Sequence, residues 1–96
     1  MTREDIATER ALKMHDLALS VMRVKGTPIP VGTIPIMEYR RGTFAVRYWP
    51  QQGQLDVWHG GSKVLTIERW RGKLQLVHYV PGPWEGVLAQ AAKVAA

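Results

Sequence analysis

The chain has 96 residues, of which 46% are hydrophobic and 22% are charged, a composition typical of one folded domain with a single modest core. It contains no cysteine, which excludes disulfides, zinc-thiolate sites and thiol nucleophiles. No apolar run approaches the ~20 residues of a membrane helix and no signal-peptide pattern follows Met1, so we expect a single cytoplasmic domain over residues 1–96 without a membrane partner.

The net charge of +5 is concentrated in the middle of the chain. Residues 1–22 have three basic and four acidic side chains, residues 23–80 have nine and three, and residues 81–96 have one of each. A basic surface on the middle segment attracts nucleic acid or an acidic partner. The alternative interpretation is that the charge only keeps a small protein soluble.

The first segment, residues 1–26, predicts a long helix from about Arg3 to Lys25. Thr2 is a good N-cap, and the carboxylate of Asp5 in the first turn interacts favourably with the helix dipole. Gly26 marks the end of the helix.

This helix has two unequal apolar faces. At ~100° per residue, most of its apolar side chains share an arc of roughly 160° and predict the face that packs on the core. They are Ile6, Ala7, Ala11, Met14, Leu17, Ala18, Val21, Met22 and Val24. Leu12 and Leu19 fall on the opposite face. Because a helix of ~35 Å is long for so small a domain, we expect it to reach a second subunit, with Leu12 and Leu19 contributing to association as a homodimer.

Residues 27–42 form a proline-rich segment. Pro28, Pro30 and Pro35 lack backbone donors and argue against a regular central strand. We expect an extended connector, followed by a candidate short edge strand from Ile36 to Tyr39.

Residues 43–80 predict an antiparallel β-meander, because four hydrophobic runs are separated by compact turns. The runs are Thr43 to Trp49, Leu55 to His59, Val64 to Trp70, and Lys73 to Val80. Together with the candidate edge strand, they predict a sheet of four or five strands.

The lengths of the turns predict how the strands pair. The two-residue turn at Arg71 and Gly72 places Leu65 opposite His78, and a three-residue loop from Gly60 to Ser62 places Leu65 opposite Val57. One face of the sheet is then almost entirely apolar and is expected to form the core. Its members are Phe44, Val46, Tyr48, Leu55, Val57, Leu65, Ile67, Leu74 and Leu76.

The other face of the sheet has a second apolar row of Ala45, Trp58, Val64 and Tyr79 beside its polar residues. A solvated sheet face is normally mostly polar. We therefore expect a helix, a second subunit or a ligand to cover part of this face.

Residues 81–96 predict a short closing helix from Trp84 to about Ala95, with Pro83 in its first turn. Trp84 is expected to anchor this helix in the core or at its rim. The predicted fold class is therefore α+β, with a long N-terminal helix, a four- or five-stranded antiparallel β-meander and a short C-terminal helix.

Patterns for catalysis and metal binding are missing from the sequence. His15, His59 and His78 have no metal-ligand spacing, and His59 and His78 are expected on the core side of the sheet. Asp56 is expected to face Arg47 across a hairpin in a surface ion pair. We expect no metal, no cofactor and no catalytic residue, and we do not expect an enzyme.

Aromatic and basic residues on the sheet and its turns are the remaining chemical feature. They are Arg40, Arg41, Arg47, Trp49, Trp58, Trp70, Arg71, Lys73 and Tyr79. Flat rings combined with cations favour nucleic acid, single strands above all. The preferred function is a small, non-catalytic, regulatory nucleic-acid-binding protein. Because tryptophans also anchor protein interfaces, the alternative is a protein-interaction or assembly module, as a homodimer or an adaptor, that uses the same face.

Overall fold

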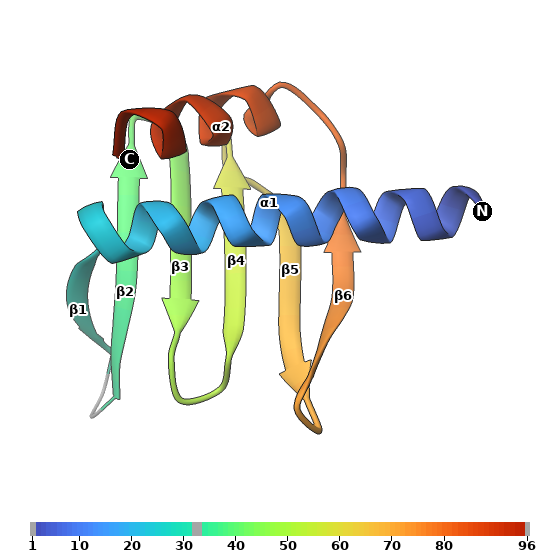
Figure 1. The fold of residues 1–96 in the computed structure, drawn as a ribbon. Helices are drawn as coiled ribbons and strands as arrows, with labels where there is room; N and C mark the ends of the chain where they lie inside the picture. Colours follow the sequence, from blue (N-terminus) through green and yellow to red (C-terminus); the bar gives the residue numbers. More distant parts are fainter. Residues whose placement is uncertain (1, 32–33, 96) are drawn as a thin grey trace.

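A computed structural model describes residues 2–31 and 34–95 of the chain (Figure 1). It confirms the predicted α+β class, with a long N-terminal helix, an antiparallel sheet and a short C-terminal helix. The sheet has six strands that neighbour each other in chain order, so the predicted number of four or five strands is wrong.

The first helix, α1, spans Arg3–Lys25 and has the predicted ends. The hydroxyl of Thr2 accepts a hydrogen bond from the Asp5 amide at 3.2 Å, and the Asp5 carboxylate accepts one from the Thr2 amide at 3.1 Å. The bond from the Thr2 amide, with that from its hydroxyl, lowers the pKa of Asp5. At the other end, a Cβ on Gly26 would lie 2.5 Å from the carbonyl oxygen of Met22, so the chain needs glycine there.

The proline-rich segment forms a β-hairpin where the sequence predicted a connector. Strand β1 spans Thr27–Val31 and β2 spans Ile34–Arg41, with Thr27 opposite Glu38. Since β1 lies at the edge of the sheet, a proline there removes no hydrogen bond from the ladder. The prolines therefore did not exclude an edge strand, and the prediction of a connector is wrong. The prediction of an edge strand at Ile36 to Tyr39 is also wrong in its position, because β2 lies between β1 and β3.

The four remaining strands form the predicted meander. Their bounds are Phe44–Trp49 for β3, Gln54–His59 for β4, Ser62–Trp70 for β5 and Lys73–Tyr79 for β6. Val57 lies opposite Leu65, as the sequence predicted.

A β-bulge in β5 changes which residues lie beside Trp58. The register shifts so that Trp58 lies opposite Lys63, and Val64 becomes the unpaired extra residue. Val64 belongs to the buried core cluster, with 8% of its surface exposed. The prediction that Val64 joins the second apolar row is therefore wrong, and Lys63 occupies that place.

A second bulge, at Val77 of β6, reverses the faces of two other residues. Leu65 lies opposite Tyr79, not opposite His78 as predicted, and His78 lies opposite Thr66. Because one extra residue moves all following side chains to the other face, Tyr79 packs against the core while His78 turns away from it. The predicted faces of both residues are wrong.

The core lies between the sheet and the two helices. Its largest fully buried apolar members include Val21, Val46, Leu55, Val57, Leu65, Ile67, Trp84 and Leu88. Leu12 and Leu19 are partly buried and pack against this cluster, so the prediction that they face away from the core is wrong. The physical reason is that α1 contacts the second helix as well as the sheet, which covers a wider arc of its surface than the sheet alone would cover.

The second helix, α2, spans Trp84–Ala95 and lies beside α1 on the same face of the sheet (Figure 1). The Trp84 indole N–H donates to the Val80 carbonyl at 2.6 Å, and only 1% of Trp84 is exposed. Trp84 is thus the core anchor that the sequence predicted. Within the described residues, both helices leave the opposite face of the sheet uncovered.

Glu85 connects three elements on the helix side of the sheet. Its carboxylate accepts hydrogen bonds from the Arg10 guanidinium of α1 at 2.8 and 3.0 Å and from the Tyr79 hydroxyl of β6 at 2.5 Å. Burial, and then the contact with Glu85, raise the pKa of Tyr79 to about 12. Through this network, Tyr79 helps to hold both helices on the sheet.

Candidate functional site

The face of the sheet that points away from the helices carries the candidate site, and we call it the open face. One row across it consists of Arg40, Ala45, Trp58 and Lys63, contributed by four neighbouring strands. The next row consists of Glu38, Arg47, Asp56, Thr66 and His78. These two rows define the centre of the open face.

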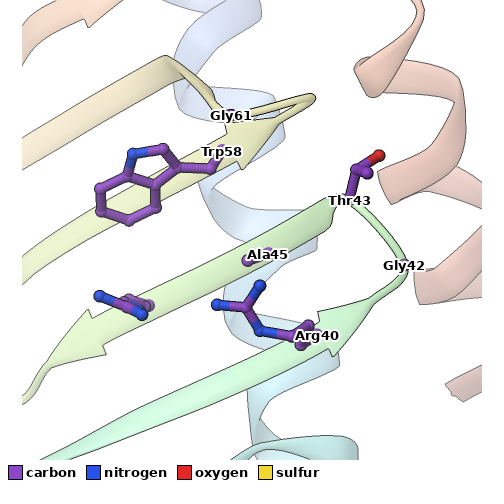
Figure 2. Close-up of a pocket in the computed structure, with 7 residues that line it drawn as sticks. Arg40, Gly42, Thr43, Ala45, Trp58 and Gly61 are labelled. Atoms are coloured by element: carbon purple, nitrogen blue, oxygen red, sulfur yellow. The ribbon is translucent and has the colours of Figure 1, made fainter.

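A hollow of about 430 Å³ lies on the open face around Ala45. Figure 2 shows Trp58 on one side of Ala45 and Arg40 on the other. Their strands are two spacings apart, which corresponds to about 10 Å. Ala45 has only a methyl group and lies at the bottom of the hollow, where the side chains around it leave 3% of its surface exposed. Thr43 and Gly61 complete the wall at one end of the sheet.

Two cations lie against the ring of Trp58. The guanidinium carbon of Arg47 is 5.4 Å from the ring centre, and the ammonium of Lys63 is 5.2 Å from it. Distances below about 6 Å are typical of cation–π contacts. Cations from both neighbouring strands, β3 and β5, therefore lie beside the ring of Trp58.

Two carboxylates lie among these cations. Glu38 accepts a hydrogen bond from Arg47 Nε at 2.7 Å and lies 3.6 Å from Arg40 Nε. The hydrogen bond from Arg47 is the main cause that lowers the pKa of Glu38. Asp56 accepts from Gln54 at 3.2 and 3.3 Å.

Asp56 pairs with a different cation from the one that the sequence predicted. Asp56 does lie opposite Arg47 in the register, but its nearest cation is Lys63, at 3.9 Å. It is also 2% exposed, so the prediction of a surface pair is wrong. The reason is that Glu38, on the other neighbouring strand, takes the guanidinium of Arg47.

The cations are much more accessible than the carboxylates. The exposed fractions of the side chains are 55% for Arg40, 43% for Lys63 and 36% for Arg47, against 16% for Glu38 and 3% for Asp56. A ligand that approaches the open face therefore meets three cations before it meets a carboxylate. This arrangement favours anions.

The remaining residues of the predicted site lie at two ends of the sheet. Arg41 follows Arg40 at the end of β2, at the same end of the sheet as the β4–β5 turn (Figure 1). Because it lies opposite Phe44, its side chain is on the helix side of the sheet, away from the open face. Trp70, Arg71 and Lys73 lie at the opposite end, where the guanidinium of Arg71 is 5.7 Å from the Trp70 ring.

The residues of the predicted site therefore do not all lie together. Trp49, two residues beyond Arg47 in β3, lies on the open face toward the Trp70 end. Tyr79 is absent from the open face because of the bulge in β6. The sequence interpretation missed Lys63 and Glu38.

The three histidines do not meet. His15 is 3% exposed, and burial is the main cause that lowers its pKa. His59 lies on the core side as predicted, with its ring 6.4 Å from that of Phe44. His78 lies on the open face, where its Nε2 is 2.9 Å from the carbonyl oxygen of Lys63. Among residues 2–31 and 34–95, no three metal-ligating side chains are grouped.

No helix in the described part of the chain is long and apolar enough to cross a bilayer. Comparisons with protein families, with curated protein sequences and with solved structures found no match to this chain.

Proposed function

We propose that this is a non-catalytic cytoplasmic protein that binds single-stranded nucleic acid through the open face, with one base stacked on Trp58 above Ala45. The observation that carries the proposal is the row of Arg40, Ala45, Trp58 and Lys63. Arg40 and the ring of Trp58 border a hollow over the methyl group of Ala45, and Arg47 of the next row also lines it.

The dimensions of the hollow suit a nucleobase. A base is about 3.4 Å thick, the rise of one step in a strand, and the two bordering strands are about 10 Å apart. Stacking of a base on an aromatic side chain contributes about 1–3 kcal/mol and depends little on base identity. The planar guanidinium of Arg40 can stack on the second face of the base or bind its phosphate.

The charges around the hollow suit the backbone of the same strand. Arg40, Arg47 and Lys63 lie around the ring on the open face. Phosphates that approach this region displace their counterions, and this release contributes to binding in low salt. We therefore assign one nucleotide to the hollow and the neighbouring phosphates to the cations around it.

Single strands fit this face better than duplexes. In a duplex the flat faces of the bases are stacked on each other, so none can lie on Trp58 without being flipped out. A single strand exposes these faces at low cost.

A second candidate function is a protein-interaction module that uses the same aromatic residues. It is favoured by Trp70, which is 59% exposed at the far end of the sheet. Exposed tryptophans are frequent anchors of protein interfaces. Binding of this kind depends mainly on apolar burial, so salt should affect it little.

The test is fluorescence polarisation with labelled single-stranded DNA, single-stranded RNA and duplex DNA over a salt titration. Three phosphate contacts give a slope of log affinity against log salt of about −2 for single strands. We expect this slope and at least about tenfold tighter binding to one of the single strands than to the duplex. Absence of binding at low salt, or affinity that does not change with salt, would contradict the proposal and favour a protein partner.

A further inference from the structure

The two edges of the sheet differ in their capacity to pair with another strand. At one edge, β1 contains Pro28 and Pro30, which have no amide hydrogen. Proteins often use prolines to block an edge. At the other edge, β6 contains no proline and carries apolar side chains that are exposed to solvent, with exposed fractions of 36% for Leu74 and 57% for Val77. β6 therefore lacks the prolines that block β1, and apart from the bulge at Val77 its edge can accept a further strand.

The helix α1 extends beyond this edge. Figure 1 shows that its first turns project past β6, on the helix side of the sheet. Ile6, in this projecting part, is 53% exposed, so the prediction that it packs on the core is wrong. Within its own chain, this part of α1 lies near the end of β6, because Ile6 and Arg10 share a hollow with Tyr79.

The start of β6 is left without a helix above it. Leu74 lies opposite Arg69 and two residues before Leu76, so it points to the helix side of the sheet. It is about 16 Å along the strand from Tyr79, where α1 crosses. The chain therefore has two exposed apolar side chains on the helix side, Ile6 at the start of α1 and Leu74 at the start of β6.

We propose that two copies of the chain associate through β6, paired antiparallel, to form one continuous sheet. A twofold axis perpendicular to the sheet keeps the helices of both copies on the same side. It also brings the projecting turns of one α1 over the start of the second copy's β6. Each Ile6 then covers the Leu74 of the other copy. This inference does not depend on the proposed function.

The charges of the two regions are complementary. The projecting turns of α1 carry exposed Glu4, Asp5 and Glu9 and one exposed cation, Arg3. Arg69, which lies opposite Leu74 on the helix side, and Arg71 in the β5–β6 turn are both exposed. In the antiparallel pair these acidic and basic groups approach each other twice, once on each side of the axis. This complementarity favours a second copy of the chain, over an unrelated strand, as the partner of β6.

The absence of native cysteine permits a direct test by cross-linking. Ile6→Cys and Leu74→Cys chains are mixed in equal amounts and oxidised, and the disulfide-linked product is identified by mass spectrometry. We expect a covalent pair between position 6 of one chain and position 74 of the other. The matched control is Val24→Cys mixed with Leu74→Cys, because Val24 is 62% exposed at the far end of the same helix. Equal cross-linking of both mixtures would overturn the proposal.

The mass in solution gives a second, independent readout. Sedimentation velocity of the unmodified chain should show two chains per particle that dissociate on dilution. Leu74→Lys combined with Val77→Lys places like charges along the paired edge, and we expect the dissociation constant to rise by about tenfold or more. Circular dichroism shows whether this double variant still folds. A single chain per particle at all concentrations, or a dimer that the double substitution leaves unchanged while the fold persists, would overturn the proposal.

Discussion

Lys63 lies opposite Trp58 in the pair of β4 and β5, with its ammonium 5.2 Å from the centre of the indole ring. The bulge at Val64 creates this relationship, because regular pairing would place an apolar side chain there. A cation–π contact at an exposed site contributes about 0.5–1 kcal/mol. Lys63 and Arg47 therefore order the ring of Trp58 before a ligand arrives, which lowers the entropy cost of binding.

The size of residue 45 tests whether the hollow is the binding site. Ala45→Ile extends a side chain into the space between Arg40 and Trp58, and β-branched residues are well tolerated in strands. We expect the affinity for single-stranded nucleic acid to fall by about tenfold or more. Because Ala45 is only 3% exposed, the larger side chain must displace its neighbours, so circular dichroism is used to check that the variant still folds. Gln75→Ile, in β6, is the control. If Ala45→Ile binds as tightly as the unmodified chain, no base occupies the hollow.

Removal of the carboxylate of Glu38 tests the role of charge. Glu38→Gln keeps the shape of the side chain but frees Arg40 and Arg47 from their acidic partner. We expect single-strand affinity at low salt to rise about two- to fivefold, and the difference to vanish at high salt because the charges are screened. Polarisation measurements at two salt concentrations give both values. Glu68→Gln, in β5, should have a smaller effect; weaker binding by Glu38→Gln would contradict the account.

The ends of the elements could be predicted from the sequence, whereas the bulges could not. Thr2 and Gly26 predicted both ends of α1, and Gly72 predicted the last hairpin. These signals are local, since each depends on a few neighbouring residues. The extra residue at Val77 has no such signal, because an apolar β-branched residue also suits a regular strand.

The glycines before the first bulge did contain usable information. Gly60 and Gly61 have φ values of 62° and 82°, as a two-residue hairpin turn requires. They pair His59 with Ser62, where the sequence interpretation counted Ser62 as part of a longer loop. With the shorter turn, Trp58 is placed beside Lys63, and the main part of the candidate site could have been found.

The ionisation of Tyr79 tests the network on the helix side of the sheet. Its pKa of about 12 lies above the ordinary value of 10.0. A raised pKa of an acid means that the stability from this group is complete below pH 10 and is lost as the pH rises toward 12. An absorbance titration should show one of the three tyrosines ionising later than the others.

Tyr79→Phe should remove this late step and lower the free energy of unfolding by about 1.5–3 kcal/mol, the range for a hydrogen bond to a charged group. Tyr48→Phe is the control. Simultaneous ionisation of all tyrosines near pH 10 would contradict the described network.

The buried imidazole of His15 should limit stability in acid. Its Nδ1 has no hydrogen-bond partner in the described structure, and burial lowers its pKa below the ordinary 6.5. A depressed pKa of a base means that its neutral form is favoured by folding, so stability is complete above pH 6.5 and is lost as the pH falls.

His15→Leu removes both the titration and the unpaired atom. We expect the free energy of unfolding to rise by about 1–2 kcal/mol, with a larger gain at about pH 5 than at pH 8. Urea unfolding at both pH values measures the free energy of unfolding, and His78→Gln, at an exposed histidine, is the control. A gain that is the same at both pH values would contradict the assignment of the titration to His15.

The central claim is that Trp58 holds a base of a single strand, and its substitution tests this most directly. Single-strand affinity is measured by polarisation over a salt titration for Trp58→Phe, Trp58→Ala and the matched control Trp70→Ala. We expect Trp58→Ala to lower the affinity about 5- to 150-fold with an unchanged salt slope. Trp58→Phe should retain most of the affinity, and Trp70→Ala should change it little. Equal losses for Trp58→Ala and Trp70→Ala, or no loss for Trp58→Ala, would contradict the claim.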